Sequence, residues 1–299
     1  MASPKAYPGY QGIAVVGGDY YRCNDFSLNV QQDVLFYNHT IGLNDTIPTD
    51  SATKGEEVGT IQTQRKYLRP SPVGMQGGFS FPAAIQDDAG ELNFKTIFDY
   101  AKYGNYFDID FHHYCNVGRT FINCRVNTFN FSITSSDIIT IAVDVLAGQM
   151  TNNDSHLSYI RPQKLVTWDL IDISISGDAG TLAGIKDGIQ SFEFNINNNA
   201  AYIYTARPFP AKAVTDIENL WPYDIRLGMQ EVTGSITVYL KQGIDFITTT
   251  TGPAIISLSC GGYFSTDINV VFKPREMPGT VGAYVLTIPF VGIDKAFGS

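Results

Sequence analysis

The sequence lacks any apolar run long enough to cross a membrane as a helix, which would take about 18 or more consecutive apolar residues. The N-terminal stretch MASPKAYPGYQG has no basic segment followed by an apolar one, so no secretion signal is expected. We therefore expect a soluble protein that does not act at a membrane.

Basic residues are also scarce. The chain of 299 residues has 20 Lys and Arg against 29 Asp and Glu, which gives a formal net charge of −9. A protein that grips nucleic acid needs clustered cations to displace the counterions of the phosphates, so this balance argues against such binding. It is compatible with a surface past which nucleic acid travels without sticking.

Cysteine and histidine are also scarce, which limits the disulfides and metal sites that the chain can form. Four Cys in so long a chain do not form a disulfide scaffold, and the four His give one cluster with metal-ligand character. That cluster is His112, His113 and Cys115, with Cys124 nearby. Zinc requires three or four such ligands in tetrahedral geometry, and polar and thiol side chains at a strand end are the favoured interpretation. A disulfide between Cys115 and Cys124 is the alternative, if their Cα atoms lie within about 7 Å.

No motif for catalysis or cofactor binding is present. The chain has no glycine-rich phosphate loop, no nucleophile elbow and no metalloprotease helix motif. Acidic pairs such as Asp87-Asp88 are typical of solvated turns. We expect no catalytic, cofactor-binding or metal-binding residues, no cofactor and no enzyme. A carbohydrate-binding β-sandwich, with Trp168 and Trp221 as ligand platforms, is an alternative, although a Trp at such a position is more often part of the core.

What the sequence does contain is period-2 alternation of apolar and polar residues, which is typical of antiparallel strands with one buried face. Between residues 120 and 133 the alternation changes parity, which predicts a β-bulge or bend near Thr128. Helical spacing predicts one helix at 91–104, ending at Gly104, and a shorter one at 213–221. The fold class is therefore mainly β, with little helix.

Two short patterns occur twice. FSLNVQQD at 26–33 matches FEFNINNN at 192–199, and Gly-Met-Gln occurs at 74–76 and again at 228–230. The order of the predicted elements around them is also kept. This indicates an internal duplication with two similar domains, residues 1–155 and 160–299.

The second copy resembles the phage tail tube (major tail) proteins of long-tailed phages. The resemblance rests on VTWDLIDISISG (166–177), GIQSFEFNINNN (188–199) and MQEVTGSITVYL (229–240), in that order. In the first copy, YLRPSPVGMQGGFSFP (67–82) and NCRVNTFNFSI (123–133) are similar to the corresponding family segments. Baseplate hub and distal tail proteins share this fold and are the alternative within the same class.

The resemblance implies two tandem antiparallel β-sandwich or open-barrel domains, each with a small flanking helix. It also implies rings of six such domains, so that three chains would form a pseudo-hexameric ring, and stacking of these rings into a tube for genome ejection. DNA would pass through the bore without specific binding. The implied partners are further copies of the chain and other tail proteins (tape measure, baseplate and terminator), and the implied location is the virion tail, after assembly in the host cytoplasm.

Three groups of residues are candidates for these contacts. The segment 40–66 has no apolar periodicity, and we expect it to contact the neighbouring ring; the alternative is a surface loop without a partner. The second-domain segment 205–226 is expected to do the same. Asp108 and Asp110 alternate with apolar residues and are expected to face the bore. The candidate residues of the first segment are Asn44, Asp45, Lys54, Glu56, Glu57, Arg65 and Lys66, and those of the second are Lys212, Asp216, Glu218 and Trp221.

Overall fold

The computed structural model describes residues 12–31, 34–40, 64–70, 74–86, 91–112, 118–153, 163–179, 188–204, 221–240, 252–273, 284–293 and 296–297. Strands make up 71% of it and helices 7%, which confirms the mainly β class. We call the described residues up to Asn153 the first half and those from Gln163 the second half.

The elements follow one another as short strands with a single α-helix among the described residues. The first half contains β1 (Gly12–Val16), β2 (Asp19–Cys23), β3 (Asp25–Gln31), β4 (Val34–Thr40), β5 (Gln64–Pro70), β6 (Gly74–Pro82), β7 (Ala84–Gln86), β8 (Glu91–Leu92), α1 (Lys95–Tyr103), β9 (Phe107–His112), β10 (Gly118–Thr134), β11 (Thr140–Ala147) and β12 (Gln149–Asn153). The second half contains β13 (Gln163–Leu165), a 3₁₀ turn (Trp168–Leu170), β14 (Ile171–Gly177), β15 (Ile189–Asn197), β16 (Ala201–Ile203), β17 (Asp224–Arg226), β18 (Glu231–Leu240), β19 (Ala254–Cys260), β20 (Phe264–Phe272) and β21 (Tyr284–Gly292).

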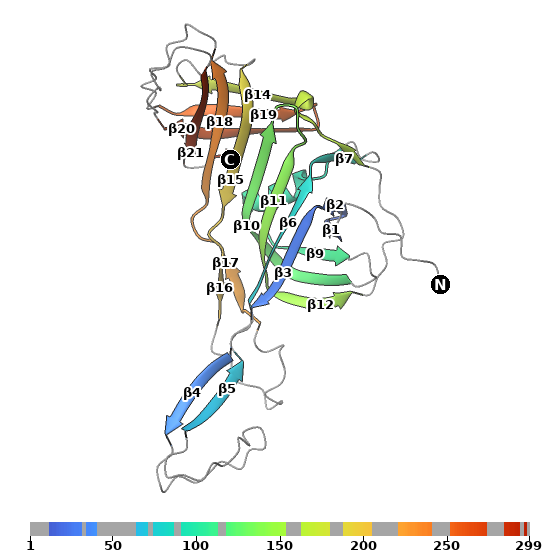
Figure 1. Ribbon diagram of the computed structural model, residues 1–299, viewed down its shortest axis with the longest axis vertical. Helices are drawn as coiled ribbons and strands as arrows, with labels where there is room; N and C mark the ends of the chain where they lie inside the picture. Colours follow the sequence, from blue (N-terminus) through green and yellow to red (C-terminus); the bar gives the residue numbers. More distant parts are fainter. Residues whose placement is uncertain are drawn as a thin grey trace, which may run out of the picture.

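One antiparallel sheet runs through both halves. Its main path is β14-β19-β20-β21-β18-β15-β10-β11-β6-β3, with β1, β2, β9 and β12 attached beside it (Figure 1). The two halves meet where β10 pairs with β15, from Thr128 opposite Asn197 to Thr134 opposite Ser191. The sheet is therefore continuous across the junction.

The long strand β10 changes its face and its neighbours at a bulge. Its register with β11 shifts between Val126 and Thr128. Before this point Phe121, Cys124 and Val126 are buried, and after it Phe129 and other odd-numbered residues are buried. The bulge predicted from the parity change is thus confirmed. Residues of β10 up to Cys124 pair with β9 or β12, those from Arg125 pair with β11, and those from Thr128 also pair with β15.

The helix predicted at 91–104 is confirmed as α1, although it begins later. Glu91 and Leu92 pair with β7 instead of forming the first turn. The helix ends at Gly104, whose left-handed φ of 67° lets its N–H bond the Tyr100 carbonyl at 2.9 Å. The second predicted helix, 213–221, lies outside the described residues except for Trp221.

Both halves share one hydrophobic core. The ring of Phe98, on α1, lies 5.5 Å from Phe129 of the first half. The same ring lies 6.3 Å from Phe194 and 5.3 Å from Phe264, both in the second half. The buried apolar residues of the two halves form a single cluster. The helix therefore packs across the junction, and the division at 155–160 stays a prediction.

Each half arranges its strands in the same way. The neighbour order is β1-β9-β10-β11-β6-β3 in the first half and β14-β19-β20-β21-β18-β15 in the second. Leu28 on β3 opposes Gly77, and Phe194 on β15 opposes Gly234. The two Gly-Met-Gln words do not follow this register, because the first lies inside β6 and the second precedes β18. The Gly-Met-Gln words at 74–76 and 228–230 therefore do not lie at equivalent positions of the two halves.

Two small hairpins lie at one end of the molecule. The β4–β5 hairpin extends away from the main sheet at the lower end of the view. Strands β16 and β17 lie between that hairpin and the main sheet (Figure 1). In each hairpin the two strands pair with each other as a separate two-stranded sheet. The Trp168 segment forms a 3₁₀ turn in which the Leu170 N–H bonds the Thr167 carbonyl at 3.1 Å, and Trp168 packs partly buried against the core.

Candidate assembly surfaces

The solvent-facing side of the main sheet is lined by small polar side chains. They alternate with the buried residues of β18, β15, β10, β11 and β6, as period-2 strands require. Several bond across strands: Thr128 donates to Asp144 at 2.7 Å, Ser235 donates to Glu193 at 2.8 Å, and Asn195 donates to Asn130. We call this surface the polar face. It includes Asn130, Ser132, Asp144, Glu193, Asn195, Glu231, Thr233 and Ser235.

The charges on the polar face have one sign. Asp144, Glu193 and Glu231 are exposed there, and the exposed Asp25 lies on β3 at the end of the path. Among the described residues of β3, β6, β11, β15, β18, β21 and the part of β10 after the bulge, there is no Lys or Arg. An exposed sheet surface of amides, hydroxyls and carboxylates repels a polyanion and gives phosphates no cation to bind.

Strand β3 forms one edge of this sheet. Among the described residues it pairs with β6 alone, from Asp25 opposite Ser80 to Gln31 opposite Gly74. On its other side no strand of the described part of the chain pairs with it, and backbone groups left in this way are a template for pairing with another chain. The sheet therefore has an open edge at β3 that can accept a further strand.

The β10–β15 junction shows what such pairing looks like inside one chain. On its core side Phe129, Phe131 and Ile133 oppose Ile196, Phe194 and Phe192. On its polar side Asn130 opposes Asn195. The strand β3 carries the matching pattern, since FSLNVQ repeats the apolar and polar positions of FEFNIN. The free edge strand of the first half, β3, is thus chemically similar to β15, the edge strand through which the second half pairs with β10.

A buried amide fixes the junction. Asn198 is 2% exposed, and its Nδ2 donates to the Ala101 carbonyl at 2.9 Å and to the Val126 carbonyl at 3.0 Å. Its Oδ1 accepts from the Gln230 side chain at 2.8 Å. Gln230 also donates to the Ala101 carbonyl at 3.1 Å. Two side chains of the second half therefore hold the C-terminal end of α1 and the bulge of β10.

The β16–β17 hairpin is fastened to the body by an aromatic residue. The Tyr106 hydroxyl donates to Asp224, and the Arg125 guanidinium lies 3.9 Å from the centre of the Tyr106 ring. Burial and the bond to Asp224 raise the pKa of Tyr106, while the same bond lowers the pKa of Asp224. The hydroxyl thus stays a donor at neutral pH, and the hairpin is tied to β10.

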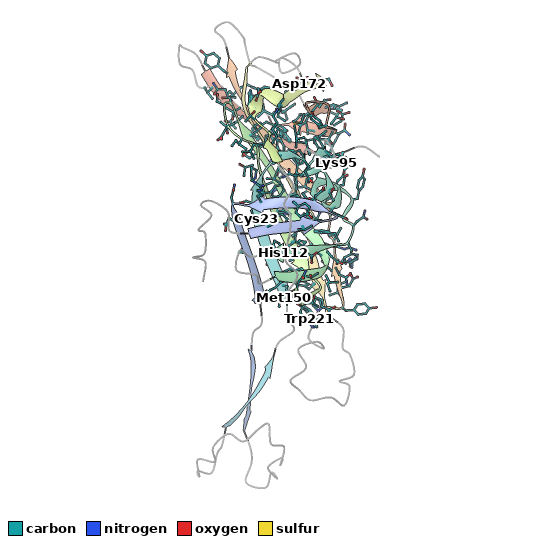
Figure 2. All side chains as sticks on the ribbon, turned by 90° about the vertical axis from the view of Figure 1, so that its right-hand side faces the viewer. Cys23, Lys95, His112, Met150, Asp172 and Trp221 are labelled. Carbon is teal, nitrogen blue, oxygen red and sulfur yellow. The ribbon has the colours of Figure 1, made fainter. Side chains whose placement is uncertain are left out.

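The residues proposed for the contact between rings are only partly placed. Arg65 and Lys66 lie on β5, opposite His39 and Asn38 of β4, so the ends of the segment 40–66 are strand and not loop. Trp221 is half-buried against the core, at the end of the body from which the β4–β5 hairpin extends (Figure 2). The others lie outside the described residues: Asn44, Asp45, Lys54, Glu56, Glu57, Lys212, Asp216 and Glu218.

Asp108 and Asp110 both lie on β9, which pairs with β1 and the first part of β10 and is not one of the strands of the polar face. Asp108 accepts a bond of 2.8 Å from the Asn123 N–H, and Asp110 accepts from Thr120 and, at 3.1 Å, from Asn153. Their place at the bore stays a prediction. The carboxylates of the polar face were missed, although Asp144 alternates with buried residues just as Asp108 does.

The candidate metal cluster is also only partly placed. His112 ends β9 and Cys124 is fully buried, while His113 and Cys115 lie outside the described residues. Within the described part of the chain there is no group of three or more His, Cys, Asp or Glu that could hold a metal ion. In the same part, no helix is long and apolar enough to cross a membrane.

A long antiparallel sheet with an open edge and one exposed polar face has the features expected of a structural protein. The comparison with protein families agrees with this class. The model of the phage tail tube protein family matches residues 47–292, which is most of the chain, and the protein therefore belongs to that family. No curated protein matches the chain. The family makes the protein a structural component of a virion tail.

Proposed function

We propose that the protein is the subunit of a phage tail tube and that three copies close into a pseudo-hexameric ring. The observation that carries this proposal is the open edge of β3. In the ring, β3 of one chain pairs with the C-terminal end of β20 in its neighbour, as β15 pairs with the C-terminal part of β10 within the chain. Closure pairs the edge at β3, which would otherwise stay open to other strands.

The shared strand order supports the pseudo-sixfold arrangement. The six strands of each half occur in the same spatial order and in the same sequence along the chain. This is what a duplication with domains near 1–155 and 160–299 produces. Each chain then supplies two of six similar units, one junction inside the chain and one between chains.

The polar face is the proposed wall of the bore. Its carboxylates and amides, without a cation among the described residues, let DNA slide past instead of binding. Asp108 and Asp110 lie on β9, beside the first part of β10, and stay secondary candidates for the wall of the bore. Rings stack through the β4–β5 hairpin and the 205–226 segment, whose described ends lie at the same end of the molecule. Assembly in the host cytoplasm and binding to tape measure, baseplate and terminator proteins belong to the same proposal.

A pair of proline variants tests the open edge. Successive N–H groups along a strand point to opposite neighbours, so Leu28→Pro and Asn29→Pro remove N–H groups on different sides of β3. One variant loses a bond to β6 and is destabilised. The other loses an N–H of the open edge, where proline is tolerated, and keeps its fold. We expect that second variant to be a folded monomer.

The readout is the mass distribution in solution together with electron microscopy. Wild-type protein is expected to form rings and tubes, and the folded proline variant neither. Single rings that never stack in the wild type would favour a baseplate hub or distal tail protein. Ring formation by both proline variants would refute the β3 junction.

A further inference from the structure

The first residues of β6, the strand that follows the β4–β5 hairpin in the chain, lie against a tyrosine of the second half. The chain returns from the hairpin into the sheet at Gly74, the first residue of β6. The Tyr202 hydroxyl on β16 donates to the carbonyl of the next residue, Met75. A Cβ added at Gly74 would lie 3.0 Å from Cε2 of Tyr202, which is tighter than an ordinary contact. Glycine at this position therefore lets the tyrosine ring reach the backbone.

A second tyrosine supports the first. The Tyr204 ring lies 6.0 Å from the Tyr202 ring, and its hydroxyl lies 3.4 Å from the same added Cβ. Burial raises the pKa of Tyr202, so its hydroxyl keeps the proton that it donates. The two rings form a small aromatic seat beside the first residues of β6.

This seat is fixed to the main sheet. Strand β16 pairs with β17 from Ala201 opposite Arg226 to Ile203 opposite Asp224. Asp224 is held by Tyr106, which in turn lies under Arg125 of β10. A continuous set of contacts thus leads from the central strand β10 to the first residues of β6, the next described residues after the hairpin.

The hairpin has little other support in the described part of the chain. There β4 and β5 pair only with each other, over seven residues each, and extend away from the body (Figure 1). A two-stranded ribbon held at one end takes its direction from the geometry of that end. A small rotation at Gly74 moves the far end of the hairpin by many times as much.

We propose that Tyr202 is a positioning residue that sets the direction of the β4–β5 hairpin toward a second copy of the chain in the next ring. This inference rests on the proposed tube function. It couples the two halves, because a side chain of the second half orients an element of the first. Ring closure through β3 does not involve this contact.

Three variants test the contact. Tyr202→Leu removes the ring and its hydroxyl, Gly74→Ala pushes the ring away, and the double variant combines them. Tyr103→Leu, which removes an exposed tyrosine from α1, is the matched control. The measurement is the critical concentration for tube elongation, taken beside the mass of the single ring.

We expect both single variants to form rings normally and to raise the critical concentration about tenfold, while Tyr103→Leu leaves it unchanged. The double variant should match Tyr202→Leu, because without the Tyr202 ring the nearest group given for the added methyl is the Tyr204 hydroxyl at 3.4 Å, which is close to an ordinary contact; such non-additivity identifies a direct contact. If Tyr202→Leu fails to fold, Gly74→Ala and Tyr202→Phe, which loses only the hydroxyl, address the same contact. Unchanged elongation in these variants, or additive effects in the double variant, would overturn the proposal. Wild-type protein that forms no rings would instead refute the tube function itself.

Discussion

Replacing Asn198 by alanine should strongly destabilise the folded chain. The substitution removes two donated bonds, to the carbonyls of Ala101 and Val126, and one accepted bond from Gln230. A buried hydrogen bond contributes about 1 kcal/mol net, and a buried group left unpaired costs about 1–3 kcal/mol. Part of the loss is offset, because Gln230 keeps its own bond to Ala101. We expect a fall of about 2–4 kcal/mol in the free energy of unfolding.

Asn195→Ala is the matched control for this substitution. Asn195 is also an amide near the junction, but it lies on the polar face and bonds one side chain, Asn130. Exposed hydrogen bonds compete with water, so its loss should cost less than about 1 kcal/mol.

The assay is urea unfolding of the unassembled chain, followed by the fluorescence of Trp168 and Trp221 and by circular dichroism. Equal m-values for both variants and the wild type would show that stability alone has changed. If Asn198→Ala falls within about 0.5 kcal/mol of Asn195→Ala, the buried amide does not hold the junction, and the reasoning is refuted.

Three further predictions follow from the packing, the thiols and the polar face. Gly234→Ala should prevent folding or strongly destabilise the folded chain, because its Cβ would overlap the Glu193 carbonyl oxygen. Gly78→Ala should be milder, because the nearest obstacle there is the movable Asp144 carboxylate. Equal melting temperatures of the two variants would contradict this. Burial raises the pKa of Cys23 from 9.0 to about 12, so the unfolded chain loses this proton first and the free energy of unfolding should fall between pH 9 and 12; a rise over that range would contradict it. Tubes of Glu193→Lys should bind short DNA in a salt-dependent way and those of Asp172→Lys, changed on β14, should not; equal binding would refute the bore assignment.

The sequence predicted the local features of this fold well. The alternation of apolar residues predicted the mainly β class, and its change of parity located the bulge at Val126–Thr128. The apolar spacing that predicted the helix comes from Phe94, Ile97, Phe98 and Ala101, which are all buried, although Phe94 is the residue that precedes the first turn. Its beginning was placed too early because Glu91 and Leu92 pair with β7, a contact to a separate strand that helical spacing does not reveal. These signals depend on neighbours along the chain.

The arrangement of the candidate site depends on pairing between distant strands, and it could not be predicted. No local pattern indicates that β10 pairs with β15, or that Asn198 reaches α1 almost a hundred residues earlier in the chain. Asp108 and Asp144 have the same alternating surroundings in the sequence. Only the strand order shows that Asp144 shares a face with Glu193.

The central claim is that the open edge of β3 closes a ring of three chains. The most direct test is a three-dimensional reconstruction of the assembled wild-type protein by electron cryomicroscopy. We predict a hollow tube of stacked rings, in which each ring has three chains and β3 continues the sheet of the neighbouring chain with the polar face toward the bore. A ring of six chains, or a tube in which β3 has no strand partner other than β6, would contradict the account.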